Sequence, residues 1–178
     1  EEGGLKITTT LDLDKQKKAE EIIVKHAAAK LARYGATNAA LIHLDPKTGQ
    51  IIAMVGSKDF FDTEHDGQVN VTTSERQPGS SFKPLVYATA FQGKYNPAFT
   101  LWDVKTDFGN YQPQNYDGNF RGPVTIRQAL ANSLNIPAVK ILYLAGIDKV
   151  LDQAHKMGIT TLNEPQRYGL ALVLGGGE

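Results

Sequence analysis

The sequence predicts a mixed fold of helices and strands, of the α+β class, in a chain of 178 residues that is 41% hydrophobic. Three observations predict it. A strand pattern and a helical apolar period occupy residues 1–36, two short apolar runs flank a turn within 37–56, and mainly helical patterns fill much of 80–178. This length and apolar content suit one domain with a hydrophobic core.

The N-terminal part is predicted to form a strand and a covering helix. Apolar and polar residues alternate over Leu5–Leu11, as in a half-buried strand. Asp12–Asp14 precedes an amphipathic helix that continues to about Tyr34 and ends at Gly35. The apolar positions of this helix recur at helical spacing: Ala19, Ile22, Ile23, His26, Ala27 and Leu31. We therefore expect the helix to lie on a sheet.

The next part is predicted to be a β-hairpin. The apolar runs Ala39–Leu44 and Ile51–Val55 flank Asp45–Gln50, a segment that contains the Pro and Gly typical of turns. Gly49 is available for a positive φ angle in this turn. The polar residues 56–79 are expected to form a surface loop.

The remainder is predicted to be mainly helical. Apolar residues indicate a buried helix from about Ser80 to Phe91. The proline- and aromatic-containing segment 93–124 is expected to be a long loop with its own apolar content, a kind of loop that is usually functional. Three further helices are expected, with Thr125 as an N-cap and Pro137 near a helix start: Thr125–Ala131, Pro137–Leu144 and Asp148–Met157.

The most informative pair is Ser80 and Lys83, because they are three positions apart where a helix begins. Residues i and i+3 share a helical face, so the hydroxyl and the amine are expected to meet. Pro84 places the helix start at or very near Ser80, since a proline ring clashes with the carbonyl four residues earlier. At a helix start the free N–H groups and the dipole favour negative charge on an attacking oxygen.

Lys83 can serve as a base for Ser80 only if its pKa falls. Lowering it from about 10.4 to near 7 takes about 4 kcal/mol, which burial can supply. Ser133 and Asn135 lie at i and i+2 between two predicted helices, where a hydroxyl could pass a proton and an amide could hold a substrate. The alternative is that both residues only terminate and cap helices. Likewise, without their flanks, Ser80 and Lys83 would be a helix cap and a solvated amine.

S-x-x-K at 80–83 followed by S-x-N at 133–135 resembles the penicillin-binding proteins and serine β-lactamases. Three flanking segments are similar to class A penicillin-binding proteins in particular: Arg76–Pro84, Asn132–Val139 and Leu174–Glu178. The similarity extends from Thr8 to the end, so residues 1–178 are identified as the N-terminal portion of a transpeptidase domain. The resemblance implies a β-lactamase/D,D-transpeptidase-like sheet sandwiched between helices, incomplete in this chain.

The same resemblance implies the activity of a peptidoglycan D,D-transpeptidase in cell-wall cross-linking. Ser80 would attack the D-Ala-D-Ala end of a stem peptide, release D-alanine and pass the acyl group to an amine on a neighbouring strand. Lys83 would be its general base, Ser133 would relay the proton to the departing amine, and Asn135 would hydrogen-bond the substrate backbone. The Ser80 N–H would form half of an oxyanion hole. β-Lactams would be trapped at the same serine.

The chain departs from the family at the third motif, K-T-G. The only copy, Lys47-Thr48-Gly49, precedes the nucleophile and lies in a predicted turn that explains its residues. We expect the family's third motif beyond Glu178, on a C-terminal segment or a second chain. Two alternatives stay open: a serine β-lactamase or D,D-carboxypeptidase, and an inactive fragment or non-catalytic peptide-binding module. Glu164 does not match the deacylating glutamate of class A β-lactamases, because it follows Leu162-Asn163 instead of preceding it.

Composition excludes several other classes. With 19 basic and 19 acidic residues, the chain lacks the basic excess of a nucleic-acid binder. The absence of cysteine excludes disulfides and thiolate catalysis. The four histidines lie at spacings that no metal site favours, so we expect no metal and no cofactor. No apolar run is long enough to span a bilayer, and Glu1–Gly4 is not a signal peptide, so any membrane anchor is expected outside the chain. The resemblance implies a location at the extracytoplasmic face of the bacterial cell membrane.

Overall fold

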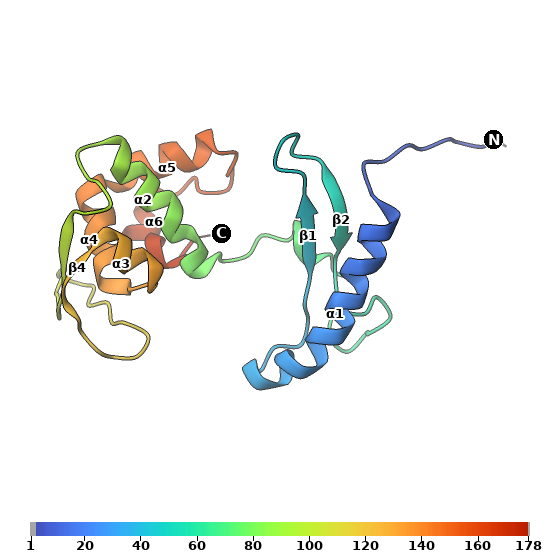
Figure 1. Ribbon diagram of the computed structural model, residues 1–178, viewed down its shortest axis with the longest axis horizontal. Coiled ribbons are helices and arrows are strands. Elements are labelled where there is room, and N and C mark those ends of the chain that lie inside the picture. Colours follow the sequence, from blue (N-terminus) through green and yellow to red (C-terminus); the bar gives the residue numbers. More distant parts are fainter. Residues whose placement is uncertain (1–2, 178) are drawn as a thin grey trace. The chain divides into compact units, whose positions relative to one another are not determined.

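The computed structural model describes residues 3–177, which form two compact units that divide between Glu75 and Arg76 (Figure 1). We call them the N-terminal unit and the C-terminal unit. Glu1, Glu2 and Glu178, which belong to the predicted chain start and closing motif, lie outside the described residues. The assignment of all 178 residues to one transpeptidase domain stays a prediction.

The first helix of the N-terminal unit, α1, spans Leu13–Tyr34, as predicted. Its N-cap is Asp12, whose carboxylate accepts the backbone N–H of Asp14 and of Lys15, at 3.1 Å each. Gly35 ends the helix with φ +62°, the left-handed conformation that glycine adopts without steric cost. Among the predicted apolar positions, Ala19, Ile23 and Ala27 are buried, Leu31 is half-buried, and Ile22 and His26 are exposed.

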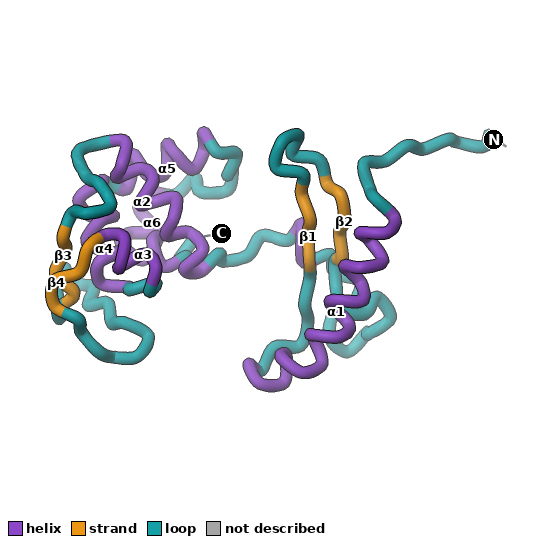
Figure 2. The backbone as a smooth tube through the Cα atoms, viewed as in Figure 1, coloured by secondary structure: helices purple, strands orange, loops and turns teal. Residues whose placement is uncertain are grey.

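The predicted hairpin is confirmed. Strand β1 (Leu41–Leu44) pairs antiparallel with β2 (Ile51–Val55), and α1 packs on β2 (Figure 2). The side chain of Gln16 fixes this packing, because it accepts from the backbone N–H of Met54 at 2.8 Å and donates to the Met54 carbonyl at 3.0 Å.

The predicted strand at Leu5–Leu11 is wrong: this segment has no regular structure. Leu5 is 87% exposed. A strand is stabilised by a ladder of backbone hydrogen bonds to a neighbour. Here, two hydrogen bonds near the end of the segment reach β2, from Thr10 Oγ1 to Ile51 O (2.6 Å) and from Asp12 N to Ile52 O (2.9 Å). The sequence does alternate between apolar and polar residues here. In the described part of this unit, however, no strand pairs with the segment along its length.

The C-terminal unit is mainly helical, as predicted, and its helices enclose the hydrophobic core. The central helix α2 packs against α4 and α5 (Figure 1). The predicted helix ends agree with the structure to within about two residues, except that α2 begins three residues after the predicted Ser80. A short helix and a closing 3₁₀ turn follow the last predicted helix. The elements are α2 (Lys83–Gln92), α3 (Ile126–Ala131), α4 (Asn135–Ala145), α5 (Ile147–Lys156), α6 (Pro165–Tyr168) and the 3₁₀ turn Gly169–Leu174.

The prediction of a loop throughout 93–124 is wrong at two places. Strands β3 (Thr100–Asp103) and β4 (Gly122–Thr125) pair antiparallel within it (Figure 2). Four-residue strands carry little periodicity, and Pro123, which lies opposite Trp102, argues against a strand unless that strand is at an edge. The intervening residues 104–121 form the loop that reaches the candidate site.

Candidate active site

Ser80 lies on a 3₁₀ turn, Gly79–Phe82, that leads directly into α2. The backbone N–H of Lys83 donates to the Ser80 carbonyl, three residues earlier, and Pro84 follows in the first turn of α2. The predicted start is therefore correct to one residue for the helical turn, while the α-helix itself begins at Lys83. The tighter turn fits the proline, because it directs the Ser80 carbonyl to a partner other than the ring nitrogen of Pro84, which cannot donate.

The Ser80 side chain is exposed. Among the described residues no hydrogen bond of 3.5 Å or less joins it to Lys83, so the predicted contact is not formed. The preceding residue, Gly79, has φ +57° and packs against Gly175 of the closing glycine segment. Gly175 has φ +81°, and a Cβ atom there would overlap the Gly79 backbone. The closing segment thus fixes the turn that carries Ser80.

Lys83 is buried and surrounded by oxygen atoms. Its side chain is 1% exposed, although lysine is rarely buried without a partner. Lys83 Nζ lies 2.7 Å from the Ser133 carbonyl oxygen, 3.1 Å from Ser133 Oγ and 2.7 Å from Asn135 Oδ1. The structure therefore brings together three of the four predicted site residues.

Burial lowers the pKa of Lys83 to about 8, because the buried site disfavours the charged ammonium. The sequence analysis predicts a lowered pKa for Lys83, and the structure agrees. The pKa lies about one unit above the value near 7 that the sequence analysis considers. A lysine with such a pKa is partly neutral at mildly alkaline pH. Its free amine can then accept a proton.

Ser133 lies in the tight connection between α3 and α4, and its φ angle is +51°, a conformation that few residues other than glycine adopt. This conformation turns the Ser133 carbonyl and hydroxyl towards Lys83. The side chain of Asn135 donates to the Gln114 carbonyl at 2.8 Å and accepts from Lys83. The backbone of Ser133 also terminates α3, because its N–H donates to the Leu130 carbonyl at 3.0 Å and the next N–H, of Leu134, donates to the Ala129 carbonyl at 2.9 Å. Neither side chain caps a helix, and both contact Lys83, so helix termination alone does not account for the pair.

The sequence interpretation missed Asn115, which lies in the long loop. Its side chain is 5% exposed and accepts the N–H of Asn135, the first residue of α4, at 2.8 Å. No local spacing relates the two residues, because they are twenty positions apart. Only the folded loop identifies Asn115 as part of the site.

The K-T-G sequence forms the hairpin turn of the N-terminal unit, as predicted. Asp45 accepts from the backbone N–H of Lys47 at 3.0 Å and from the Thr48 hydroxyl at 2.8 Å. Within residues 3–177, no three His, Asp or Glu side chains are grouped as a metal site would require. In the same residues, no helix has the length and apolar content needed to cross a membrane.

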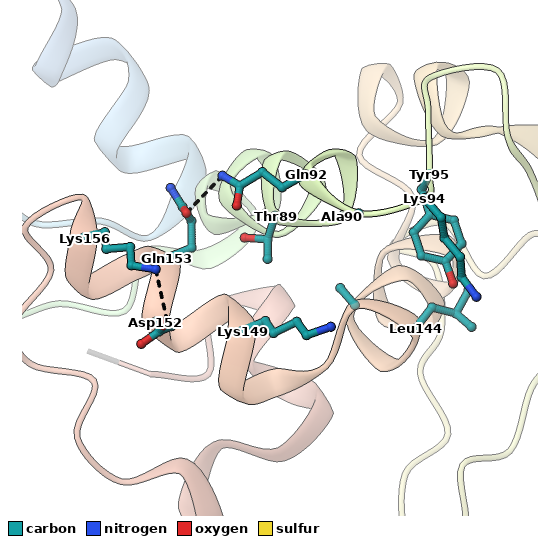
Figure 3. Close-up of a pocket in the computed structure, with 12 residues that line it drawn as sticks. Thr89, Ala90, Gln92, Lys94, Tyr95, Leu144, Lys149, Asp152, Gln153 and Lys156 are labelled. Atoms are coloured by element: carbon teal, nitrogen blue, oxygen red, sulfur yellow. Dashed lines mark hydrogen bonds and ion pairs between the residues drawn. The ribbon is translucent and has the colours of Figure 1, made fainter.

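A pocket of about 600 Å³ lies at the far end of α2 from Lys83 (Figure 3). Residues of α2, α4 and α5 line it. In its lining, a hydrogen bond of 3.0 Å from Gln92 to Gln153 joins α2 to α5, and an ion pair of 3.2 Å links Lys156 and Asp152 within α5. Its lining includes none of the four predicted site residues, so it is separate from the candidate active site.

Comparison with known proteins identifies similar sequences. Residues 39–171 match the model of the penicillin binding protein transpeptidase domain. The chain is 36% identical to penicillin-binding protein 1C of Escherichia coli over 173 residues, which are 96% of the chain and 22% of that protein. It is 39% identical to penicillin-binding protein 1B of Vibrio cholerae over 167 residues, 89% of the chain and 21% of that protein. The chain thus spans about a fifth of the length of these curated relatives.

Solved structures show a similar fold. Penicillin-binding protein 1A of Haemophilus influenzae aligns with a TM-score of 0.67 and 30% identity, over 79% of this chain and 21% of that one. PonA1 of Mycobacterium tuberculosis in complex with penicillin V aligns with a TM-score of 0.74 and 24% identity, over 95% of this chain and 46% of that one. The fold is therefore that of a part of these proteins, which agrees with an incomplete α+β arrangement.

Proposed function

This chain belongs to the penicillin-binding protein transpeptidase family, and we propose that it carries the acylating residues of a peptidoglycan D,D-transpeptidase. The proposed substrates are stem peptides that end in D-Ala-D-Ala, and β-lactams are the proposed inhibitors. The observation that carries the proposal is the buried Lys83 amine, which contacts Ser133 and Asn135 at 2.7–3.1 Å and lies one helical turn after the exposed Ser80. The complex of PonA1 with penicillin V supports the choice of inhibitor.

The proposed acylation begins when the neutral amine of Lys83 takes the proton of the Ser80 hydroxyl. Ser80 Oγ then bonds to the peptide carbonyl carbon, and the backbone N–H of Ser80 donates to the oxygen that becomes negative. The C–N bond breaks, and the departing D-alanine nitrogen receives a proton from Lys83 through Ser133. An acceptor amine next attacks the ester and loses a proton to Lys83, and Ser80 regains its hydroxyl proton.

The contacts of Lys83 support Ser133 as the proton relay. A protonated lysine has three hydrogens for its three oxygen neighbours, whereas a neutral lysine has two hydrogens and a lone pair. Of the three neighbours, the Ser133 carbonyl and Asn135 Oδ1 only accept, so Ser133 Oγ is the one that can donate to the lone pair. Deprotonation of Lys83 is thus matched by a reversal of this one hydrogen bond.

The Asn135 amide has the capacity to hold a substrate as well. Its Nδ2 carries two hydrogens, and the Gln114 carbonyl accepts one of them. The second hydrogen is available for a carbonyl of the stem peptide. This geometry supports the role of substrate-binding residue that the S-x-N motif implies.

The complete cleft requires a K-T-G strand, which we propose comes from a C-terminal segment or a second chain. Without that strand the chain would be an inactive fragment, which is the alternative to test first. The proposed substrate lies outside the cytoplasmic membrane, so we propose the extracytoplasmic face of the bacterial cell membrane as the site of action, with a membrane anchor on another part of the protein.

The experiment that tests the proposal is covalent labelling of the full-length protein with a fluorescent penicillin, followed by mass spectrometry. We expect one adduct, on Ser80, and none in Ser80→Ala. Ser81→Ala is the matched control, because its exposed hydroxyl lies next in the chain and donates to the Pro78 carbonyl at 2.5 Å. A Ser80→Ala protein that labels as fully as Ser81→Ala contradicts the proposal.

The lifetime of the adduct separates transfer from hydrolysis. Glu164 is exposed and pairs with Arg167 at 3.5 Å. We propose that no base in this chain activates water for rapid deacylation, so the adduct should persist. Loss of the label within seconds would favour a β-lactamase or carboxypeptidase. If residues 1–178 alone never label and the full-length protein does, the isolated chain is the inactive fragment.

A further inference from the structure

The first turn of α4, which carries Asn135, is held by a side chain from another part of the C-terminal unit. Its own N-cap residue, Leu134, supplies no side-chain hydrogen bond. Asn115 Oδ1 instead accepts from the backbone N–H of Asn135 at 2.8 Å, with a longer contact to Ile136 N at 3.4 Å. Because helix starts have unpaired N–H groups, this contact fixes where α4 begins.

The orientation of the Asn115 amide is fixed by a buried carboxylate. Asn115 Nδ2 donates to Asp103 Oδ1 at 2.8 Å and Oδ2 at 2.9 Å, and to the Asn119 carbonyl at 2.8 Å. Asp103 lies at the end of β3, is fully buried, and also accepts from the Arg121 backbone N–H at 3.1 Å. An ionised carboxylate only accepts, so it requires the NH₂ group of Asn115 and directs Oδ1 towards α4.

A buried carboxylate is costly unless hydrogen bonds or nearby cations compensate for its lost hydration. Two cationic groups, of Arg121 and Lys140, interact electrostatically with Asp103 but make their hydrogen bonds to other partners. The Arg121 guanidinium pairs with Asp117 at 2.7 Å, and Lys140 Nζ, on α4, donates to the Trp102 carbonyl at 2.6 Å. The hydrogen bonds to Asp103 therefore come from the Asn115 amide and one backbone N–H.

A continuous chain of hydrogen bonds leads from this carboxylate to the candidate base. Asp103 holds Asn115, Asn115 holds the backbone of Asn135, and Asn135 Oδ1 accepts from Lys83 at 2.7 Å. The residue before Asn115, Gln114, accepts from the other end of the Asn135 amide. The loop thus fixes both the position of Asn135 and the way its amide points.

We propose that Asn115 and Asp103 are positioning residues, which hold the Ser133–Asn135 segment against Lys83 and so set the rate of acylation at Ser80. This inference rests on the proposed function. In this proposal, neither Asn115 nor Asp103 touches the substrate or Ser80. Their effect reaches the reaction through Asn135.

A charge swap tests the pair, because Asn and Asp have nearly the same shape. Asn115→Asp alone would oppose two carboxylates and should slow acylation of the full-length protein by at least about tenfold, since small displacements of catalytic groups are costly. Asp103→Asn alone should slow it less. The double variant N115D/D103N restores one donor and one acceptor between the two sites but not the hydrogen bond to the Asn119 carbonyl, so its rate should recover part of the loss, as a double-mutant cycle measures.

The pH profile of the double variant distinguishes positioning from general support of the fold. The swap moves a negative charge from position 103 to position 115, which is two hydrogen bonds from Lys83. A nearby carboxylate favours the ammonium, so the acid limb of the acylation profile should move to higher pH. An acid limb that does not move would contradict the coupling of position 115 to Lys83. Asn110→Asp, an exposed change in the same loop, is the matched control and should leave both unchanged.

Amide hydrogen exchange at Asn135 and Ile136 gives a readout that needs no activity. Both amides should exchange faster in N115D and recover in the swap. If the wild-type protein never labels at Ser80, the proposed function fails while exchange still tests the positioning. If N115D does not fold, Asp103→Asn and the swap carry the test. A folded single variant with wild-type acylation and wild-type exchange overturns the inference, and so does a swap that folds yet acylates no faster than the slower single variant.

Discussion

The two units differ in how they treat their apolar residues. The C-terminal unit encloses a core in which residues such as Val86, Ile141 and Leu142 are fully buried. The N-terminal unit buries few side chains and leaves apolar residues of its hairpin exposed, among them Leu44, at 47%. The packed unit is also the one that carries the candidate site. A closed core is what allows Lys83 to be held away from water, which the open hairpin layer does not provide.

The largest expected effect is on acylation, and it should be confined to the C-terminal unit. Lys83→Met keeps the apolar bulk but removes the base, and general bases typically contribute 10²–10⁴-fold, so the acylation rate should fall by about that factor. Lys58→Met is the matched change in the N-terminal unit, where Lys58 pairs with Asp62 at 3.0 Å. It should leave acylation unchanged. Equal losses in a stopped-flow measurement of the two variants would contradict the assignment of the base.

The difference in burial should appear as a difference in stability. Leu142→Ala removes a fully buried side chain and should lower the free energy of unfolding by about 2–5 kcal/mol. Leu44→Ala is the same change at an exposed position, and it should lower the free energy of unfolding by less than about 1 kcal/mol. Urea unfolding of the 178-residue chain, with hydrogen exchange to separate the units, measures both. Comparable losses of unfolding free energy in the two variants would contradict the exposure of Leu44 on β1.

The left-handed glycines offer a finer comparison. Gly175→Ala combines a positive φ with overlap of the Gly79 backbone, so it should cost about 2–4 kcal/mol and slow acylation. Gly35→Ala shares the left-handed φ but has open space around its Cβ position, so only about 1 kcal/mol is expected. Thermal unfolding and acylation rates of both variants test the claim. A Gly175→Ala protein that acylates as fast as the Gly35→Ala protein would contradict the role given to Gly175.

The smallest expected effects concern helix caps. Thr125 and Gln128 form a reciprocal capping box at the start of α3, and Asp12 caps α1 with two contacts of 3.1 Å. Thr125→Ala and Asp12→Ala should each cost about 1 kcal/mol. Hydrogen exchange should place the first loss in the C-terminal unit and the second in the N-terminal unit. A loss that spreads equally over both units would contradict their description as separately packed.

Local signals in the sequence predict much of this molecule. Asp12 and Gly35 mark the ends of α1, and the Ser80–Lys83 spacing marks the start of the central helix. The features that were missed depend on distant partners. The strand pattern at Leu5–Leu11 has no neighbour along its length, β3 and β4 stabilise each other across a loop, and Asn115 meets Asn135 only when that loop folds. Local propensity carries no information about such contacts, because they arise from tertiary packing.

The S-x-x-K and S-x-N motifs indicated four candidate residues, and the structure brings three of them together around the buried Lys83 amine. Lys83 contacts Ser133 and Asn135 and makes no hydrogen bond to Ser80 in the described residues. Spacing on one helical face therefore predicts which residues belong together, but the fold decides which of them touch.

The most direct test of the central claim, that a buried Lys83 is the base for Ser80, is the pH dependence of the second-order rate of acylation by a β-lactam, which reports the free protein. Deprotonation creates the base, so the rate should rise with pH. Its midpoint should lie near 8, the value to which burial lowers the pKa of Lys83. The rise should be absent in Lys83→Met. A midpoint at about 10.4, the value of an ordinary solvated lysine, or a rate independent of pH between about 6 and 10, would contradict the account.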